Sequence, residues 1–431
     1  MKLRLVIAAT LGLSAGPAFA DDRLVILHTN DFHARFEPVD RFGAACTEEG
    51  RAAGRCYGGA ARLTTAIRAA RQRFANTVLL DGGDQFQGSL FYTVHKGGLA
   101  AEMMNRLGYD AMAVGNHEFD DGPAALRDFV NAAKFPVLSV NVDVGNAPQL
   151  DGLLRKSAVI MRGGRRIGLI GLTPEDTAGS SSPGPGVTFG DPVAAVRAEV
   201  DRLTAAGVKR IVVLSHSGYE IDKRIARETS GVDVIVGGHS HTPLGEDVPW
   251  SAGPYPTMVG DTAVVQAYAY GVFLGVLSVA FDAAGRVTAA SGGPVLLDST
   301  VAADAAVQAR IEQAAQPLKE VRGRVVAEAA APVAGGALAC RSGECQMGTL
   351  VADAMLDRVR GQGIDVALQN GGGLTRTGGS GWSRTRMRPR WCWLPPPASA
   401  GLLPRCARRT CGRCRGHRPR SCMTCRARRL P

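Results

Sequence analysis

Five short polar clusters in the sequence combine the side chain types that bind divalent metal ions. They read His-Thr-Asn-Asp-Phe-His at residues 28–33, Asp-Gly-Gly-Asp at 81–84, Gly-Asn-His-Glu-Phe-Asp at 115–120, Ser-His-Ser-Gly at 215–218 and Gly-Gly-His-Ser-His at 237–241. Six of the eight histidines of the chain fall in these clusters. Imidazole favours zinc and similar ions, whereas carboxylate and amide oxygens suit manganese and magnesium. The mixture predicts a site for a pair of divalent cations.

Two metal ions about 3.5–4 Å apart can hold a phosphate group and activate a water molecule for attack on phosphorus. Side chains two residues apart in an extended segment point the same way, so Asp31 and His33 can bind one ion. His239 and His241 repeat this spacing, although we expect them to bind different ions. A single cluster of this kind is more often a surface or hydrogen-bonded group, but five clusters in one chain favour the metal interpretation.

The elements that must position these clusters alternate along the chain. Short apolar runs predict strands over residues 24–28, 77–80, 111–114, 137–142, 166–172, 210–215 and 232–236. Amphipathic stretches predict helices over residues 59–74, 97–107, 123–133, 192–206 and 304–318. Strands that are apolar along their whole length predict a sheet covered on both faces.

Each polar cluster directly follows a predicted strand. Ligand sites of α/β sheets lie at the carboxyl ends of the strands. The five clusters should therefore meet if their strands are parallel. From residue 263 the apolar residues alternate with other types, which predicts antiparallel strands.

The composition excludes several classes of protein. The chain has 431 residues, of which 45% are hydrophobic and 21% charged, which is typical of a globular protein of two domains. Its net charge of +11 would favour a nucleic-acid binder, but 14 arginines and no acidic residues lie in 381–431, leaving −3 for residues 1–380. We therefore expect no nucleic-acid partner. No apolar run after the first 20 residues reaches the length of about 20 that spans a bilayer.

Residues 1–20 have the pattern of a secretory signal peptide. Lys2 and Arg4 precede an apolar run over residues 5–13, and Ala18-Phe19-Ala20 fits the small-x-small cleavage rule. The pattern predicts cleavage after Ala20 and a periplasmic or secreted chain without a membrane span; the alternative is an uncleaved anchor. Because that compartment is oxidising, paired cysteines can form disulfides.

In this order the five clusters resemble the motifs of the calcineurin-like metallophosphoesterases and, more narrowly, of the secreted 5′-nucleotidases. The resemblance covers roughly residues 24–370. It implies an α/β fold with a four-layered α/β-β/α metal domain over residues 21–301, a linker helix region over 302–332 and an α/β substrate-binding domain from residue 333.

The resemblance also implies the roles of individual side chains. Seven would hold two divalent ions, zinc, manganese or similar: Asp31, His33 and His241 for one, Asn116, His216 and His239 for the other, and Asp84 for both. His117 would stabilise the phosphoryl transition state, and Asp120 would orient the His117 ring. A cationic imidazole at this place would counter charge that builds up on the phosphate oxygens.

Four cysteines and two polar residues complete the implied set. By resemblance, Cys46 would pair with Cys56, and Cys340 with Cys345; the alternative is free thiols. Two further residues match substrate-contacting positions of the family: Arg341 on the phosphate side and Asn370 against the nucleoside.

The resemblance ends near residue 376. The family pattern Asn-Gly-Gly-Gly-x-Arg is followed here with one extra residue, so that the arginine is Arg376. From residue 381 the chain has no Val, Ile, Phe, Tyr, Asp, Glu, Lys, Asn or Gln, a composition that cannot build a core. We interpret residues 333–376 as a truncated domain and 377–431 as a disordered basic tail read out of frame.

Two other interpretations of the tail compete with the frameshift. Two Cys-x-x-Cys pairs at 411–414 and 422–425 have the form of a zinc site, although the gap between them is short. An arginine-rich arm for nucleic acid is electrostatically feasible.

The function implied by the resemblance is hydrolysis of a nucleoside 5′-monophosphate to nucleoside and phosphate, in nucleotide catabolism. UDP-sugars, 2′,3′-cyclic nucleotides and thiosulfate remain alternative substrates. The 44 residues of the truncated domain are too few for a stable core, so an inactive metal-binding remnant is a further alternative. The sequence leaves the native metal and the oligomeric state open.

Overall fold

A computed structural model describes residues 23–324, 333–335, 340 and 342–369 of the chain. The predicted signal peptide, Arg341, Asn370 and the basic tail lie outside these residues.

In the part of the chain that the structure describes, fourteen strands form two large sheets and one small one. The first sheet contains β1 (Arg23–Thr29), β2 (Thr77–Asp81), β3 (Ala111–Ala113), β4 (Val137–Leu138), β13 (Phe273–Phe281) and β14 (Val287–Leu296). The second contains β6 (Ser157–Arg162), β7 (Arg165–Leu172), β9 (Arg210–Ser215), β10 (Val234–Val236), β11 (Thr257–Val259) and β12 (Thr262–Val265). The third is the pair β5 (Val142–Asp143) and β8 (Thr188–Phe189).

The described residues also form helices of 4 to 19 residues. They are α1 (Glu48–Ala52), α2 (Ala60–Arg73), α3 (Leu90–Leu107), α4 (Gly122–Ala132), α5 (Thr177–Ser180), α6 (Pro192–Ala205), α7 (Tyr219–Glu228), α8 (Ala305–Gly323) and α10 (Gln346–Arg358). Single 3-10 turns lie at His117–Phe119 and Pro148–Leu150.

The strand order explains where the carboxyl ends of the strands meet. The first sheet runs β14-β13-β1-β2-β3-β4 and the second β11-β12-β10-β9-β7-β6. Strands β1 to β4 are parallel, as are β7, β9, β10 and β12. The antiparallel strands β6, β11, β13 and β14 lie toward the sheet edges.

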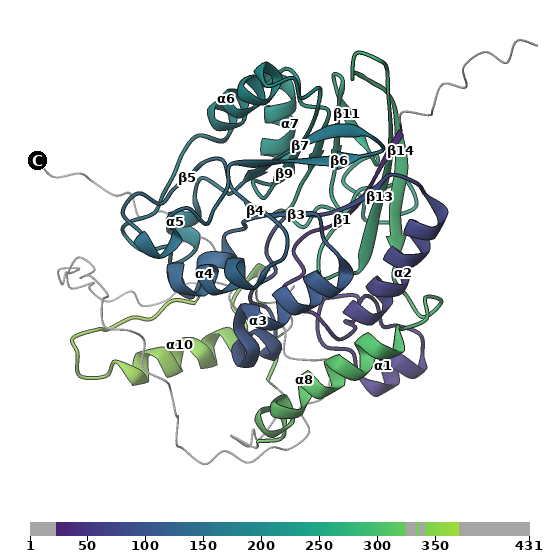
Figure 1. Ribbon diagram of the computed structural model, residues 1–431. Coiled ribbons are helices and arrows are strands. Elements are labelled where there is room, and N and C mark those ends of the chain that lie inside the picture. Colours follow the sequence, from purple (N-terminus) through teal and green to yellow (C-terminus); the bar gives the residue numbers. More distant parts are fainter. Residues whose placement is uncertain (1–22, 325–332, 336–339, 341, 370–431) are drawn as a thin grey trace, which may run out of the picture. The chain divides into compact units, whose positions relative to one another are not determined.

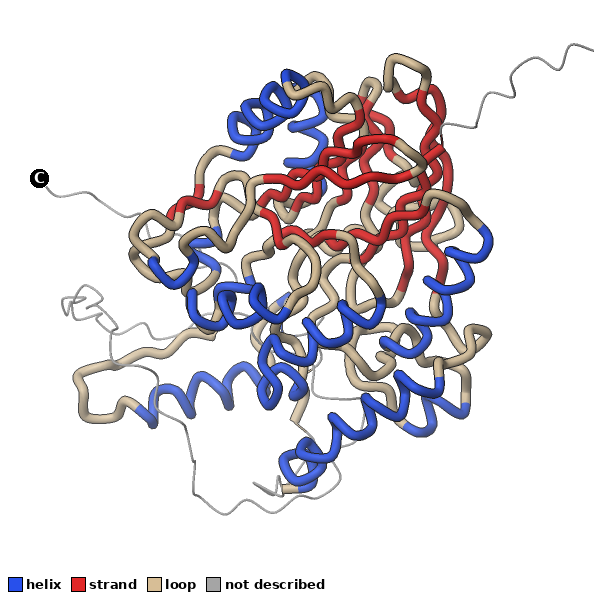
Figure 2. Tube along the Cα trace, viewed as in Figure 1, coloured by secondary structure: helices blue, strands red, loops and turns tan. Residues whose placement is uncertain are grey.

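The two large sheets pack face to face, with helices on their outer faces (Figures 1 and 2). Successive side chains of a strand point to opposite faces, so in β1 Val25 and Leu27 pack toward α2, α3, α4 and α8, while Leu24 and Ile26 pack toward the second sheet. Helices α6 and α7 cover the other side of the second sheet. The predicted four-layered α/β architecture is confirmed.

Three predicted elements differ from the structure. The strand predicted over 137–142 is broken into β4 and β5, because Val140 N donates to Gly171 O of β7 and the Asn141 side chain donates to Thr173 O. The helix predicted from residue 97 begins at Leu90, with a kink at Lys96. The alternating stretch from residue 263 is strand only to Val265 and its antiparallel partner is β11; the long hairpin follows as β13 and β14.

The helix expected in the linker region packs into the core of the metal domain. Helix α8 buries Val307, Ile311 and Leu318 among the side chains that cover the first sheet. Arg310 donates two hydrogen bonds to Glu102 of α3, at 2.9 and 2.7 Å. The helix extends five residues beyond its predicted end, to Gly323. Among the described residues no helix is both long enough and apolar enough to cross a bilayer.

Candidate metal centre

The clusters that the sequence singles out lie beyond the carboxyl ends of five strands from two sheets. Asp31 and His33 follow β1, Asp84 follows β2, and Asn116 follows β3, all in the first sheet. The remaining three follow strands of the second sheet: His216 after β9, and His239 and His241 after β10. The site is therefore built where the two sheets converge.

Two glycines allow the loops of the two sheets to approach this closely. A Cβ atom at Gly82 would lie 2.8 Å from the carbonyl oxygen of Gly237, and one at Gly238 would lie 2.7 Å from that of Gly82. Any larger residue would push the loops apart. The Gly82 carbonyl also lies 2.5 Å from His216 Nδ1, which joins a loop of the first sheet to a side chain of the second.

The first group of side chains surrounds Asp31. His241 Nε2 lies 3.1 Å from Asp31 Oδ1 and 3.2 Å from His33 Nε2. Ligand atoms about 2.0–2.2 Å from one ion stand about 3–3.5 Å from each other. The three side chains thus have the mutual spacing of ligands to one cation.

The second group surrounds Asp84. His216 Nε2 lies 3.0 Å from Asp84 Oδ2, and His239 completes this group. The Asn116 Oδ1 atom lies 3.0 Å from His239 Nδ1. The two groups adjoin, because His33 Nε2 lies 3.8 Å from Asp84 Oδ2. The structure brings all seven proposed ligands together.

The ring nitrogens of His33 and His216 are oriented as metal ligands. His216 Nδ1 faces the Gly82 carbonyl and His33 Nδ1 faces the Phe86 carbonyl, at 2.5 and 3.1 Å. A carbonyl accepts a hydrogen bond, so in the neutral rings the proton lies on Nδ1 and the lone pair on Nε2. In the neutral ring the buried Nε2 of His216 then directs its lone pair at Asp84 Oδ2, which lies 3.0 Å away. A cation between this lone pair and the carboxylate would attract both.

The electrostatics of the cluster point the same way. Asp31 and Asp84 are buried, and two buried carboxylates need compensating positive charge. Burial opposes ionisation of Asp84, but the neighbouring imidazoles, His216 first, outweigh it and hold its pKa well below the usual range. Burial likewise opposes protonation of His216, but Asp84 and Asp31 raise its pKa to about 10. The site therefore attracts positive charge strongly.

Five of the seven proposed ligands have left-handed backbone conformations, which are uncommon for residues other than glycine. The positive φ angles are 51° at Asp31, 49° at His33, 62° at Asp84, 69° at His239 and 48° at His241. Such conformations cost free energy and cluster at functional sites, where the surrounding structure holds them.

His117 and Asp120 lie at the edge of the cluster. The His117 ring stands edge-on to that of His33, with 5.3 Å between the ring centres, and its Nδ1 lies 2.6 Å from Asp120 Oδ2. Burial lowers the pKa of His117, but Asp120 and Asp84 outweigh it and raise that pKa to about 9. The ring is thus held in one orientation and favours its cationic form.

Three functional residues were missed from the sequence. Ser181 Oγ donates to Asp120 Oδ1 at 2.7 Å, so it anchors the partner of His117; nothing in the serine-rich run at 180–182 marks it. Asp81 accepts hydrogen bonds from Thr29 Oγ1 and from Gly83 N in the Asp84 loop. Glu118 contacts two ligand loops. Asp81 and Glu118 belong to two of the five polar clusters, so their acidic side chains could have indicated a role at the site.

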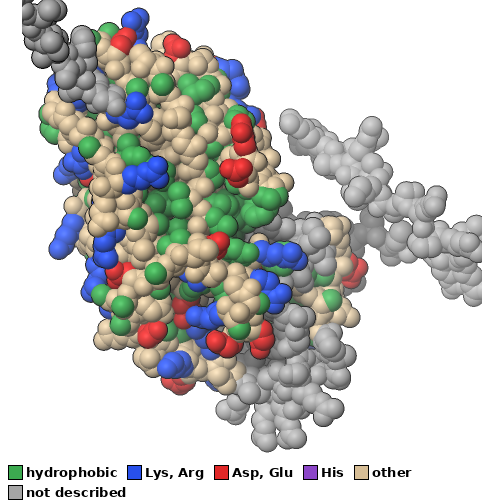
Figure 3. All heavy atoms as spheres, turned by 90° about the vertical axis from the view of Figure 1, so that its right-hand side faces the viewer, with side chains coloured by type: hydrophobic (Ala, Val, Ile, Leu, Met, Phe, Trp, Pro, Cys, Tyr) green, Lys and Arg blue, Asp and Glu red, His purple; other side chains and the backbone are tan. Residues whose placement is uncertain are grey.

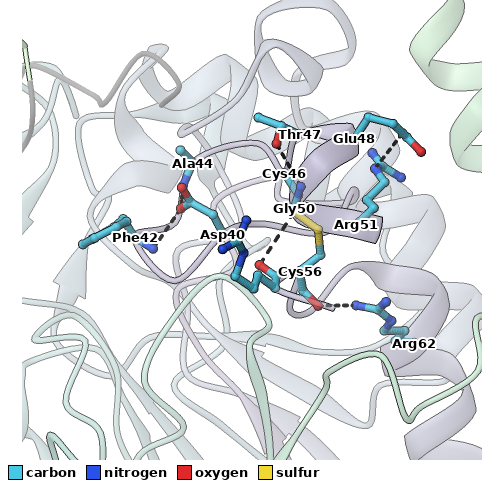
Figure 4. The surroundings of a disulfide bond; sticks show 11 residues. Asp40, Phe42, Ala44, Cys46, Thr47, Glu48, Gly50, Arg51, Cys56 and Arg62 are labelled. Carbon is cyan, nitrogen blue, oxygen red and sulfur yellow. Dashed lines mark hydrogen bonds and ion pairs between the residues drawn. A yellow bond between two sulfur atoms is a disulfide. The ribbon is translucent and has the colours of Figure 1, made fainter. Parts of the chain in front are cut away.

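Both cysteine pairs form disulfides in the structure. The Cα atoms of Cys46 and Cys56 are 5.8 Å apart, on either side of α1, and Arg62 Nη1 donates to the Cys56 carbonyl at 2.7 Å (Figure 4). Cys340 and Cys345 have Cα atoms 5.0 Å apart. Arg341 and Asn370, the two proposed substrate contacts, lie outside the described residues.

An aromatic cavity of about 860 Å³ is lined by the segment 245–250 and by residues of β13 and β14. None of the seven proposed ligands lines it. Its aromatic lining comprises Tyr57, Trp250, Tyr255, Tyr268 and Phe273. Figure 3 shows apolar side chains gathered in the middle of the face that carries β13 and β14, to which Phe273 and Leu296 of the cavity belong.

Removing divalent ions should lower the thermal stability of the protein. Asp31 and Asp84 are buried carboxylates close to each other, and divalent cations would neutralise both, so binding to the folded state should stabilise it by about 2.7 kcal/mol at 100 times Kd. We expect a chelator to lower Tm, and two equivalents of Mn²⁺ or Zn²⁺ to restore it, measured by calorimetry and elemental analysis. Ca²⁺, which prefers all-oxygen sites, is the control. A Tm that does not respond to Mn²⁺ or Zn²⁺ would contradict this assignment.

A family model, related sequences and solved structures match this chain. The family model described as calcineurin-like phosphoesterase matches residues 24–243. The 5′-nucleotidase of Rattus norvegicus is 40% identical over 391 residues, which cover 86% of this chain and 67% of that protein. The crystal structure of a 5′-nucleotidase precursor from Thermus thermophilus matches with a TM-score of 0.73 and 42% identity, over 81% of this chain and 70% of that one.

A more distant structure shares the fold. The NAD nucleotidase of Haemophilus influenzae matches with a TM-score of 0.65 and 24% identity, over 78% of this chain and 68% of that one. The chain thus spans about two thirds of the length of these relatives.

Proposed function

Because this chain belongs to the calcineurin-like phosphoesterases, among the 5′-nucleotidases, we propose that it converts nucleoside 5′-monophosphates to nucleosides and phosphate. It is a metal-dependent phosphoric monoester hydrolase by family. The observation that carries the nucleotide proposal is the meeting of the Asp31 and Asp84 groups in a chain 40% identical to a 5′-nucleotidase.

In this proposal Asp31, His33 and His241 hold one ion, Asn116, His216 and His239 hold the other, and Asp84 contacts both. We propose zinc or manganese, which accept this mixture of nitrogen and oxygen ligands. When bound, two such ions would supply positive charge for the phosphate group and would activate a water molecule for attack on phosphorus. The rigid loops of the two sheets fix the separation of the ligand sets.

In this proposal the cationic ring of His117 adds a positive charge near the phosphate, beside that of the metal ions. Its Nδ1 is occupied by Asp120, so Nε2 is the atom available to a phosphate oxygen. A fixed cationic donor aimed at an oxygen that gains charge lowers the barrier without reorganising. Ser181 holds Asp120 and thereby the orientation of the ring.

The remaining parts of the proposal concern export and substrate binding. The signal-like sequence of residues 1–20 supports export to the periplasm or beyond the cell, with the mature chain beginning at Asp21. Arg341 and Asn370, in the segment 333–376, would contact the phosphate side and the nucleoside.

The substrate proposal is tested by steady-state kinetics of the metal-loaded full chain. We expect kcat/KM for AMP to exceed that for UDP-glucose and for 2′,3′-cyclic AMP by at least about tenfold, a margin that one or two specific polar contacts provide. A reversed order would replace the nucleotidase proposal with hydrolysis of the preferred ester. Two bound ions without turnover of any ester would indicate an inactive metal-binding remnant.

A further inference from the structure

Two loops that carry proposed metal ligands touch each other beneath the cluster. One runs from Asp81 to Phe86 and presents Asp84; the other begins at Gly115 and presents Asn116. The main-chain N–H of His117 donates to Asp84 Oδ1 at 3.0 Å. A Cβ atom at Gly115 would lie 2.2 Å from that same oxygen. The position of the Asp84 carboxylate therefore depends on how closely the main chains of the two loops pack.

One side chain, Glu118, binds the main chain of both loops. It is fully buried, with a relative exposure of 0%. Its Oε1 accepts hydrogen bonds from Gln85 N at 2.8 Å and Phe86 N at 3.2 Å. Its Oε2 accepts from Asp84 N at 3.0 Å and Gly115 N at 2.7 Å.

Such a carboxylate restrains both loops at once. A carboxylate has about four lone-pair positions, and here four main-chain donors fill them. Hydrogen bonds to an ionised acceptor are roughly twice as strong as neutral ones. Three donors come from the loop whose Asp84 has an unfavourable φ of 62°, and the fourth comes from the loop of Asn116. Without Glu118 these N–H groups would have to find other acceptors in a buried region.

We propose that Glu118 is a positioning residue that sets the separation of the two metal ions by fixing Asp84 relative to Asn116. This inference rests on the proposed two-metal function, because it assigns Asp84 to both ions. Glu118 belongs to none of the candidate ligand groups of the described residues, and its two oxygens accept hydrogen bonds from main-chain N–H groups. Its effect should appear in the binding of the second ion and in the coupling between the ions, before it appears in the fold.

The test replaces Glu118 with glutamine in the full chain. The amide keeps the shape but has one accepting oxygen, and its NH₂ group faces main-chain donors. Mn²⁺ is titrated into metal-free protein and followed by electron paramagnetic resonance, because two nearby bridged Mn²⁺ ions give a coupled signal distinct from that of isolated ions. We expect Glu118→Gln to bind one Mn²⁺ as the unchanged protein does, to bind the second about 10–100-fold more weakly, and to lose the coupled signal.

The matched control is Asp233→Asn. Asp233 is a partly buried carboxylate that accepts a main-chain hydrogen bond, from Ile211 N at 2.7 Å, but it lies at the opposite end of β10 from His239. The control should keep both Mn²⁺ affinities and the coupled signal. Equal affinities and an intact coupled signal in Glu118→Gln would overturn the proposal, and so would equal losses in the two variants.

A shorter carboxylate keeps the test decisive if Glu118→Gln does not fold. Glu118→Asp retains the charge but cannot reach all four donors, so we expect a smaller loss of second-ion affinity. Unchanged Mn²⁺ binding in this variant would overturn the proposal. The protein without substitutions tests the proposed function separately. If that protein binds no coupled pair of Mn²⁺ ions, the two-metal function is wrong, and so is this inference.

Discussion

Replacing His117 with alanine should leave two metal ions bound and lower kcat for AMP by about 10²–10⁴-fold, the range typical of a lost proton-donating or charge-stabilising group. The proposed ligands are seven other side chains, so the ions do not depend on the imidazole. Asp120 and Asp84 favour the charged ring, whose positive charge would act on the phosphate. The measurement pairs kcat with elemental analysis of the same sample.

The control for this variant is His95→Asn. His95 lies on α3 and faces the Ala314 carbonyl of α8 at 2.7 Å, away from the cluster, so its loss should leave kcat unchanged. Asp120→Asn provides a second check. Because Asp120 raises the pKa of His117, its removal should shift the loss of activity at alkaline pH to a lower pH. Full turnover in His117→Ala would remove this residue from the mechanism.

Replacing Asp84 with asparagine should abolish the metal pair. The carboxylate is proposed to contact both ions, and the amide has neither its charge nor its second accepting oxygen. We expect metal content to fall from two ions to one or fewer, and kcat/KM to fall by about 10³-fold or more, corresponding to several kcal/mol of lost charge stabilisation. Metal content, Tm and kinetics should be measured on one preparation.

Asp143→Asn is the matched control for that substitution. Asp143 accepts a hydrogen bond from Gly145 N in an exposed turn, so the control should keep two ions and normal turnover. Retention of two ions together with normal kinetics in Asp84→Asn would show that the carboxylate is not shared. Stable protein without ions would separate the metal role from folding.

The five polar clusters could be predicted from the sequence because an apolar strand followed by polar residues is a local pattern. Residues 24–27 are apolar and Asp31 follows within four residues, and the same relation holds for Asp84 after β2. That the strands before His216 and His239 belong to a different sheet from β1 could not be predicted from spacing alone, since strand pairing joins residues far apart in the chain. The resemblance supplied that architecture, and the structure agrees.

Other features depended on contacts that no local pattern carries. Residues 137–142 read as one strand, yet Val140 bonds to β7, and this tertiary hydrogen bond divides the segment. Ser181 lies 61 residues from its partner Asp120. The packing of α8 into the core could not be predicted from the sequence, because its polar residues outnumber the residues that it buries.

The left-handed backbone of the ligands has a consequence for how this protein can change. At Asp31, His33, Asp84, His239 and His241, glycine and asparagine are compatible with the backbone, whereas valine, isoleucine and threonine are not. Selection at these positions therefore acts on two properties at once, the ligand atom and the backbone conformation. A lineage that lost its metals would first drift at these codons to glycine or asparagine, so the protein could retain its architecture for a long time after its chemistry had gone.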